Sequence, residues 1–220
     1  MKQTFRWRSF VPCKAAISFI LLLQFEKLNA QPFDFLNINN INARVNAGGS
    51  LFQDLTWGQA AFEVPKGSGK HTILNAELWI GGLQNGTTLH QAGQLYGGFI
   101  GDTTFWPGPI MDTSSYSVSQ DLLWNRVWKV EKSDIESHMI NWTESGYVIP
   151  QSLIDWPGNG DVSKGQAKLL APFFDRVGDD VYDPADGDYP LIRGDQAIYF
   201  IYNDDRKVHL NGGEKLKIEI

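Results

Sequence analysis

Six aspartates crowd into one short stretch of the chain, between residues 175 and 188. Carboxylates this close together repel one another unless a cation or hydrogen-bond donors offset their charge, and hard oxygen ligands of this kind suit Ca²⁺. Counted from the first aspartate, side-chain oxygens stand at positions 1, 5, 9 and 12, and a backbone carbonyl stands at position 7. The sequence therefore predicts a calcium-type loop with the ligands Asp175, Asp179, Val181, Asp183 and Asp186.

The spacing of these ligands resembles the EF-hand-like loop of dockerins and related extracellular calcium repeats, which share Asp at the same four positions. Two residues depart from that pattern: Val177 stands where Asp or Asn is usual, and Asp180 stands where Gly makes the sharp turn. We expect Val177 to lower the affinity, because it removes a side-chain oxygen. We expect Asp180 to accept a left-handed backbone at a cost of about 1 kcal/mol. The alternative is a solvated acidic turn without a bound ion.

The motifs of common enzyme classes are incomplete in this chain. The glycine-rich run Lys66–His71 lacks the first Gly and the hydroxyl residue of a phosphate-binding loop, so we expect a hairpin or loop there. No Ser stands in a Gly-x-Ser-x-Gly elbow, and the four His are scattered without the spacing of a zinc protease. The sequence predicts a non-catalytic protein whose only expected cofactor is Ca²⁺.

The composition is typical of a turn-rich β protein and not of a disordered or membrane-embedded chain. Of 220 residues, 42% are hydrophobic, 20% charged and 13% aromatic, and 22 Gly and 10 Pro supply turns. The net charge of −6 argues against a nucleic-acid partner, because phosphates attract basic surfaces. A single Cys excludes an internal disulfide framework.

Residues 1–30 have the pattern of a secretory signal peptide. A basic start precedes an apolar run at 15–25, which is too short to cross a bilayer as a helix, and Ala30 offers a cleavage site. Cleavage would remove Cys13 and leave 14 basic and 24 acidic residues, a net charge of −10. We expect an exported bacterial protein, extracellular or on the outer-membrane surface, with no membrane span after cleavage. The alternative is an uncleaved N-terminal anchor.

Residues 31–220 are predicted to form a single, mainly β domain: an antiparallel, sandwich-like arrangement with one short helix and long loops. Alternating apolar residues predict strands at 60–64, 72–80, 87–96 and 215–220. Asn85-Gly86 predicts a type I′ turn between two of them. The uniformly apolar segment 197–202 predicts a central strand buried on both faces. A capping box of Ser133 and Glu136 predicts a helix at about 133–144.

Five short motifs, in this order, resemble the N-terminal region of large, poorly characterised surface or secreted proteins of bacteria that use type IX secretion. They are FLNINNINAR at 35–44, FEVPKGSGKH at 62–71, LWIGG at 78–82, FWPGP at 105–109 and DGDYP at 186–190. The resemblance covers about residues 35–220 and implies a C-terminal sorting domain in the complete protein. The alternation at 215–220 also stops without a turn, so we expect the polypeptide to continue. The family brings no established catalytic residues.

Two functions follow from these patterns. The first is a non-catalytic cell-surface or secreted module, adhesive or structural, with a calcium-stabilised loop. The second is a carbohydrate-binding or carbohydrate-active protein, because exposed indole rings stack on sugars. Seven Trp beyond the signal segment are candidates for such a platform: Trp57, Trp79, Trp106, Trp124, Trp128, Trp142 and Trp156. The expected partner is a surface ligand, either a glycan or a protein.

Overall fold

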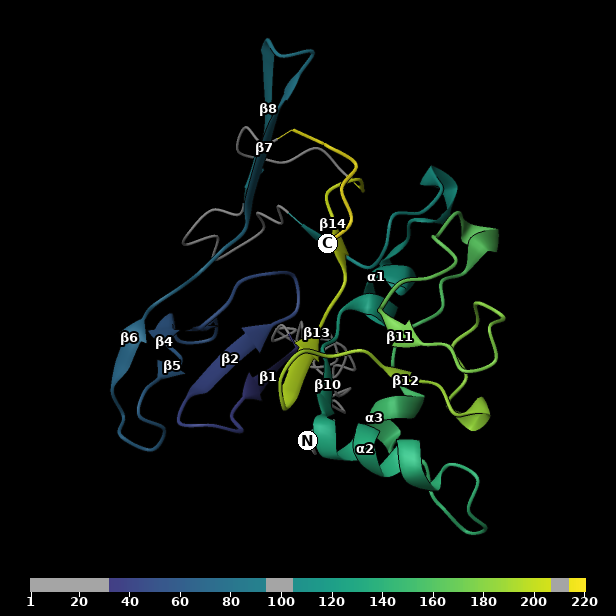
Figure 1. Ribbon diagram of the computed structural model, residues 1–220. Helices are drawn as coiled ribbons and strands as arrows, with labels where there is room; N and C mark the ends of the chain where they lie inside the picture. Colours follow the sequence, from purple (N-terminus) through teal and green to yellow (C-terminus); the bar gives the residue numbers. More distant parts are fainter. Residues whose placement is uncertain (1–31, 94–104, 207–213) are drawn as a thin grey trace, which may run out of the picture.

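The computed structural model describes residues 32–93, 105–206 and 214–220, so the predicted signal peptide lies outside the described residues. Within these ranges the strands pair antiparallel, in one four-stranded sheet and five two-stranded sheets (Figure 1). Three short α-helices and three 3₁₀ turns stand between the strands of the described ranges. The predicted mainly β fold with long loops is confirmed.

The four-stranded sheet is built from the N-terminal part of the chain. Its order is β1 (Phe33–Leu36), β2 (Asn42–Asn46), β5 (Phe62–Glu63) and β6 (His71–Ile73), and β3 (Gln53–Asp54) pairs with β4 (Gln59–Ala60) in a separate hairpin. The glycine-rich run at 66–71 connects β5 to β6, as the sequence predicts, and the amide of Gly69 donates to Glu63 Oε1 at 2.6 Å.

The hairpin of β7 (Trp79–Gln84) and β8 (Thr88–Gly93) contains the predicted type I′ turn. Asn85 and Gly86 have φ of 52° and 72°, and the amide of Thr87 donates to the Gln84 carbonyl at 3.2 Å. The predicted strand at 72–80 is wrong in its extent, because only its two ends are strand. The residues between β6 and β7 make a single bridge, from Ala76 to Leu51. Residues 94–96 of the predicted partner strand lie outside the described residues.

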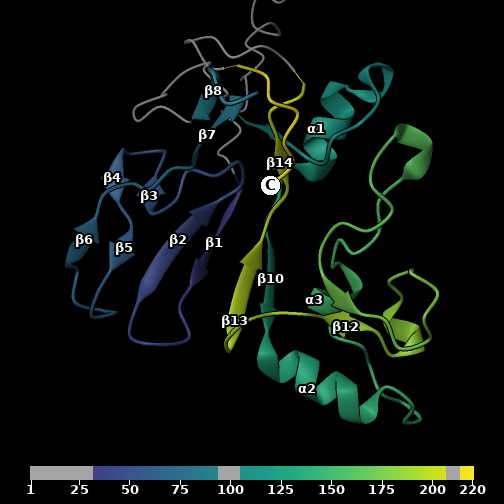
Figure 2. The same ribbon diagram turned by 45° about the horizontal axis from the view of Figure 1, so that its top comes forward.

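The second half of the chain packs around an aromatic core. β10 (Trp128–Glu131) pairs with β13 (Gln196–Tyr199), and α2 (Lys132–Asn141) and α3 (Gln151–Ile154) pack against β10. The β10–β13 ribbon lies between the four-stranded sheet and these helices (Figures 1 and 2). The buried members of the core are Trp128, Val130, Ile135, Leu153, Trp156, Ala171 and Tyr182.

The predicted helix at about 133–144 forms as α2, but the predicted capping box is wrong. Glu131 is the N-cap and no side chain caps the first turn, because β10 runs directly into the helix. The amide of Lys132 donates instead to the Asp195 carbonyl at 2.9 Å. Two helices were not expected from the sequence: α3 and α1 (Val118–Trp124), whose N-cap Ser117 accepts from the Gln120 amide.

The remaining elements are short. They are β9 (Trp106–Pro107), β11 (Phe173–Phe174), β12 (Tyr189–Pro190), β14 (Tyr202–Asn203), and 3₁₀ turns at Thr113–Ser115, Val162–Lys164 and Pro184–Asp186. The prediction of one central strand at 197–202 is wrong: the segment divides into β13 and β14, which pair with β10 and β9. The predicted strand at 215–220 is reduced to a bridge between Glu219 and Asn203. Beside it, the Ile220 amide donates to the Tyr202 carbonyl and the Tyr202 amide donates to the Ile220 carbonyl, each at 2.9 Å.

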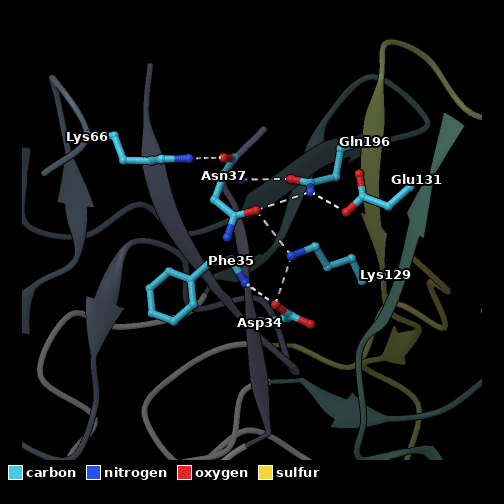
Figure 3. Close-up of polar contacts among 7 residues, drawn as sticks. All are labelled: Asp34, Phe35, Asn37, Lys66, Lys129, Glu131 and Gln196. Carbon is cyan, nitrogen blue, oxygen red and sulfur yellow. Dashed lines mark hydrogen bonds and ion pairs between the residues drawn. The ribbon is translucent and has the colours of Figure 1, made fainter. Parts of the chain in front are cut away.

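A seam of side-chain hydrogen bonds joins the N-terminal sheet to the β10–β13 ribbon (Figure 3). Gln196 Oε1 accepts from the amide of Asn37 at 2.7 Å, and Gln196 Nε2 donates to Glu131 Oε1 at 2.6 Å. Lys129 Nζ donates to Asp34 Oδ1 at 3.3 Å. β1 and β13 are therefore joined through side chains and not through a backbone ladder. The N-terminal sheet and the β10–β13 ribbon remain separate sheets.

Candidate functional site

The acidic loop, residues 175–188, connects β11 to β12. These strands pair at the base of the loop, Phe174 opposite Tyr189, and the two rings stack with centroids 4.8 Å apart. Lys168, outside the loop, contributes one cation: its Nζ donates to the Asp179 carbonyl at 3.2 Å and to Asp180 Oδ2 at 3.4 Å. The loop is thus closed at its base, and part of its negative charge is offset by a neighbouring lysine.

Asp175, the first predicted ligand, organises the first half of the acidic loop. Its Oδ2 accepts from the amide of Asp180 at 2.8 Å and its Oδ1 from the amide of Gly178 at 2.6 Å. These bonds, first of all the one from Asp180, hold the pKa of the Asp175 carboxyl below its usual value. Asp180 has a φ of 57°, which is the left-handed backbone expected at the turn position of a calcium-type loop.

The other predicted ligands are spread along the rest of the loop. Asp179 Oδ1 accepts from the Val181 amide at 2.9 Å, and Asp183 Oδ1 accepts from the Ala185 amide at 2.8 Å. Asp186 lies in the 3₁₀ turn that Asp183 caps. Within the ranges that the structure describes, no three or more His, Cys, Asp or Glu side chains are grouped closely enough to hold a metal ion. The predicted ligands share one loop but are not gathered around one point.

Asp188 is the residue of this loop that sequence reasoning missed. It is fully buried, and its two oxygens accept from the amides of Arg176 and Asp183, at 2.8 and 2.9 Å. One carboxylate thereby links the beginning of the loop to its middle. Its place in the motif DGDYP, between a sharp turn and an apolar strand, is the only sequence signal for this role.

The end of the acidic loop packs closely against the end of α2. Arg176 Nε donates to the Gly187 carbonyl at 3.1 Å, and its guanidinium lies over the Trp142 ring, 5.2 Å from the centroid. Gly187 has a φ of 90°, and a Cβ at this position would lie 2.7 Å from Arg176 Nε and 2.8 Å from the Trp142 ring. The contact therefore requires glycine.

Exposed indoles are fewer than the seven sequence candidates. Trp128 and Trp156 belong to the buried core, whereas Trp57 and Trp79 are 75% and 74% exposed. Trp57 lies in the turn between β3 and β4, and Trp79 begins β7. The other three are half-buried: Trp106, Trp124 and Trp142.

A second acidic stretch, Asn203–Asp205, is buried. Its side chains make structural hydrogen bonds that the sequence did not predict. Asp204 Oδ2 and Oδ1 accept from the amides of Leu216 and Ile218, each at 2.7 Å. Asn203 Nδ2 donates to the Gly108 carbonyl at 2.8 Å. These bonds hold the C-terminal segment and the loop after β9 on β14.

The described histidines have separate environments. His71 is exposed on β6, His138 is buried in α2, and His90 Nδ1 lies 2.6 Å from Glu214 Oε2.

Comparisons of the chain with protein-family models, with curated proteins and with solved structures found no match. No helix in the described ranges has the length and apolar character needed to cross a bilayer. A functional assignment rests on the geometry of the acidic loop and of the exposed side chains.

Proposed function

We propose that this chain is a non-catalytic module of an exported bacterial surface protein, of the type that uses type IX secretion, with an adhesive or structural task. The observation that carries the proposal is the outward face of the β7–β8 hairpin, which projects from the rest of the fold (Figure 1). Trp79 and Leu83 lie on the same face of β7, and Leu89 of β8 pairs with Leu83. The three residues are 74%, 61% and 61% exposed, in that order. Large apolar side chains grouped on one exposed face are typical of a contact surface.

The hairpin proposal is tested by binding of the purified chain to arrays of surface glycans and extracellular proteins. A Leu83→Ser, Leu89→Ser double variant removes apolar area without touching the core. Leu122→Ser, Leu123→Ser is its matched control, because both side chains of α1 are 60% exposed. We expect a loss of at least tenfold in affinity in the hairpin variant and none in the control. Equal binding by the two variants, or no binding by the parent chain, would contradict the proposal.

The same proposal includes Ca²⁺ bound by the acidic loop through Asp175, Asp179, Asp183, Asp186 and the Val181 carbonyl. Two features support it: the left-handed backbone at the turn position, and hydrogen bonds that keep the first ligand ionised. Coordination requires rotation of the other carboxylates, because the structure does not gather them. The ion would offset the repulsion between them and so stabilise the loop.

The second candidate is carbohydrate binding, which the indole of Trp57 favours. Its ring stands on a tight turn, beside Gly58 with a φ of 65°, and 75% of the residue is exposed. A flat exposed ring of this kind suits the apolar face of a sugar. On the glycan array, loss of binding in Trp57→Ala with binding retained in the hairpin double variant would favour this function over the first.

A further inference from the structure

The seam between β1 and the β10–β13 ribbon brings an amine, a carboxamide and a carboxylate together (Figure 3). Lys129 Nζ lies 3.3 Å from Asn37 Oδ1 and 3.3 Å from Asp34 Oδ1. All three residues are half-buried, and the Lys129 side chain is 22% exposed. An amine, an amide carbon and a proton carrier in contact are the parts needed to form a new amide bond between two side chains.

The hydrogen bonds of the seam determine which way the Asn37 carboxamide points. The backbone amide of Asn37 donates to Gln196 at 2.7 Å, so the accepting atom is Oε1 and the other end of the Gln196 side chain is Nε2. Gln196 Nε2 in turn donates to Asn37 Oδ1 at 3.2 Å. The carbonyl oxygen of Asn37 therefore faces two donors, Gln196 Nε2 and Lys129 Nζ.

Gln196 is placed to stabilise negative charge on this carbonyl oxygen. When an amine adds to an amide, negative charge develops on the oxygen, and a fixed N–H donor at that oxygen lowers the barrier. The Gln196 side chain is held at both ends, because Oε1 accepts from the Asn37 amide and Nε2 also donates to Glu131 Oε1 at 2.6 Å. The donor therefore needs no rearrangement when the charge develops.

The fold also holds the amine of Lys129 at the group that it would attack. Lys129 lies on β10, whereas Asn37 directly follows β1, and these strands belong to separate sheets. Nζ at hydrogen-bond distance from Oδ1 is one bond away from Cγ. Groups held in this way react as if each were present at about 10⁵–10⁸ M, which offsets the low reactivity of an amide.

We propose that Lys129 and Asn37 form an intramolecular isopeptide bond in the folded chain, with Asp34 as the proton carrier. In the ion pair, the Lys129 ammonium gives one proton to Asp34 Oδ1, and the free amine adds to Asn37 Cγ. The Nζ–Cγ bond forms and the Cγ–Nδ2 bond breaks, and the leaving nitrogen takes one proton from Nζ and one from Asp34. It departs as ammonium, the Asp34 carboxylate is restored, and no co-reactant is consumed.

The bond would close residues 37–129 into a covalent ring and join the N-terminal sheet to the ribbon permanently. The reaction occurs once in each chain and acts on the chain itself. It does not depend on the ligand of the β7–β8 hairpin or on Ca²⁺, so it is tested in excess chelator and fails independently of both proposals.

The intact mass of the purified chain tests the bond. Each variant is compared with the mass of its own sequence, and we expect the parent chain to lack one ammonia that Lys129→Arg retains. Arginine keeps the positive charge, but its guanidinium stays protonated and does not attack. Lys66→Arg is the matched control and should lose ammonia like the parent, because Lys66 Nζ donates to the Asn37 backbone carbonyl at 2.5 Å. An equal loss in the parent chain and in Lys129→Arg would overturn the proposal.

Digestion of the parent chain with trypsin locates the bond without any variant. Trypsin cuts after Arg126 and Lys132 but not after an acylated lysine. The expected product is therefore residues 127–132 joined to the peptide that contains Asn37, and tandem mass spectrometry should place the branch at this residue. Linear peptides alone, or a branch at Asp34 formed with loss of water, would overturn the assignment.

The role of Asp34 is tested by the rate of bond formation. Chains synthesised without cells are sampled over time, and the branched peptide at Asn37 is quantified. Asp34→Asn cannot accept the proton, so its bond should form at least about tenfold more slowly than that of the parent chain. The same rate in both chains would show that Asp34 is not the proton carrier, and this part of the proposal would be wrong.

Discussion

Two aspartate-rich stretches of this chain use the same side chain in opposite ways. The acidic loop at 175–188 is conspicuous in the sequence, and most of its carboxylates lie at the surface and bond to amides of the loop itself. The stretch Asn203–Asp205 is inconspicuous, yet it is buried and holds two distant segments on β14. A carboxylate stabilises the fold according to its burial and to the amides it meets. The density of aspartates along the sequence does not reveal this.

The largest effect is expected from Asp204→Ala in the buried stretch. The substitution leaves the amides of Leu216 and Ile218 without acceptors in a partly buried place, at about 1–3 kcal/mol each. We expect about 4 kcal/mol of destabilisation and a fall in melting temperature of about 10 °C. Thermal melting checks this, with Asp195→Ala, an exposed aspartate, as the control. Equal melting temperatures of the two variants would show that the buried Asp204 contributes no more to stability than an exposed aspartate.

Asp188→Ala should produce the next largest effect, because Asp188 is the one fully buried carboxylate of the acidic loop. The amides of Arg176 and Asp183 lose their acceptor, and we expect about 3 kcal/mol of destabilisation in chemical denaturation. Asp188→Asn retains one acceptor oxygen and should lose about half as much. If Asp188→Ala were no worse than Asp179→Ala, burial would not be the deciding factor.

Calcium tests the exposed carboxylates of the loop as a group. At a hundred times its Kd, Ca²⁺ should stabilise the fold by about 2.7 kcal/mol and raise the melting temperature by roughly 5–10 °C. Asp179→Ala should remove most of the increase, and Val177→Asn should enlarge it by restoring a third-position oxygen. Melting in millimolar Ca²⁺ is compared with melting in excess chelator at fixed ionic strength, so that charge screening is constant. Identical melting temperatures in Ca²⁺ and in chelator, for the parent chain and for Val177→Asn, would mean that the loop is a solvated acidic turn without a bound ion.

The smallest effect concerns Glu219, which contrasts with Asp175. Burial raises the pKa of the Glu219 carboxyl, whereas amide hydrogen bonds lower that of Asp175. The folded state therefore holds the Glu219 proton more tightly than the unfolded state, and stability is lost as the pH rises through the raised pKa. Glu219→Gln keeps an acceptor for the Ile110 amide and should raise the melting temperature by about 1–3 °C at pH 7 and not at pH 4. An equal gain at both values would exclude titration as its cause.

What the sequence predicted well is local. The type I′ turn follows from Asn85-Gly86, because two neighbouring residues set the backbone, and the left-handed Asp180 follows from its place in the loop. The capping box failed because β10 leads directly into α2, and the first amide of the helix donates to the carbonyl of Asp195, far along the chain. Local propensity gave way there to tertiary pairing.

What the sequence missed depends on partners far along the chain. Asn203 bonds a carbonyl 95 residues away, and the Tyr116 hydroxyl reaches Asp205 across 89 residues. No spacing rule joins such pairs. Asp188 has closer partners, 5 and 12 residues away, but only its burial distinguishes it from five neighbouring aspartates.

The seam between β1 and β13 also bears on the time course of folding. Asn37 and Gln196 are separated by 159 residues, so their bond forms only after most of the chain has been synthesised. Contacts of such sequence separation carry a large loop-closure entropy and are typical of slow folding. Until they form, β1 lacks its neighbour β13, and the two sheets are not joined. If the chain is exported as we propose, slow closure of this seam would lengthen the time in which the polypeptide can still be threaded unfolded through a narrow channel.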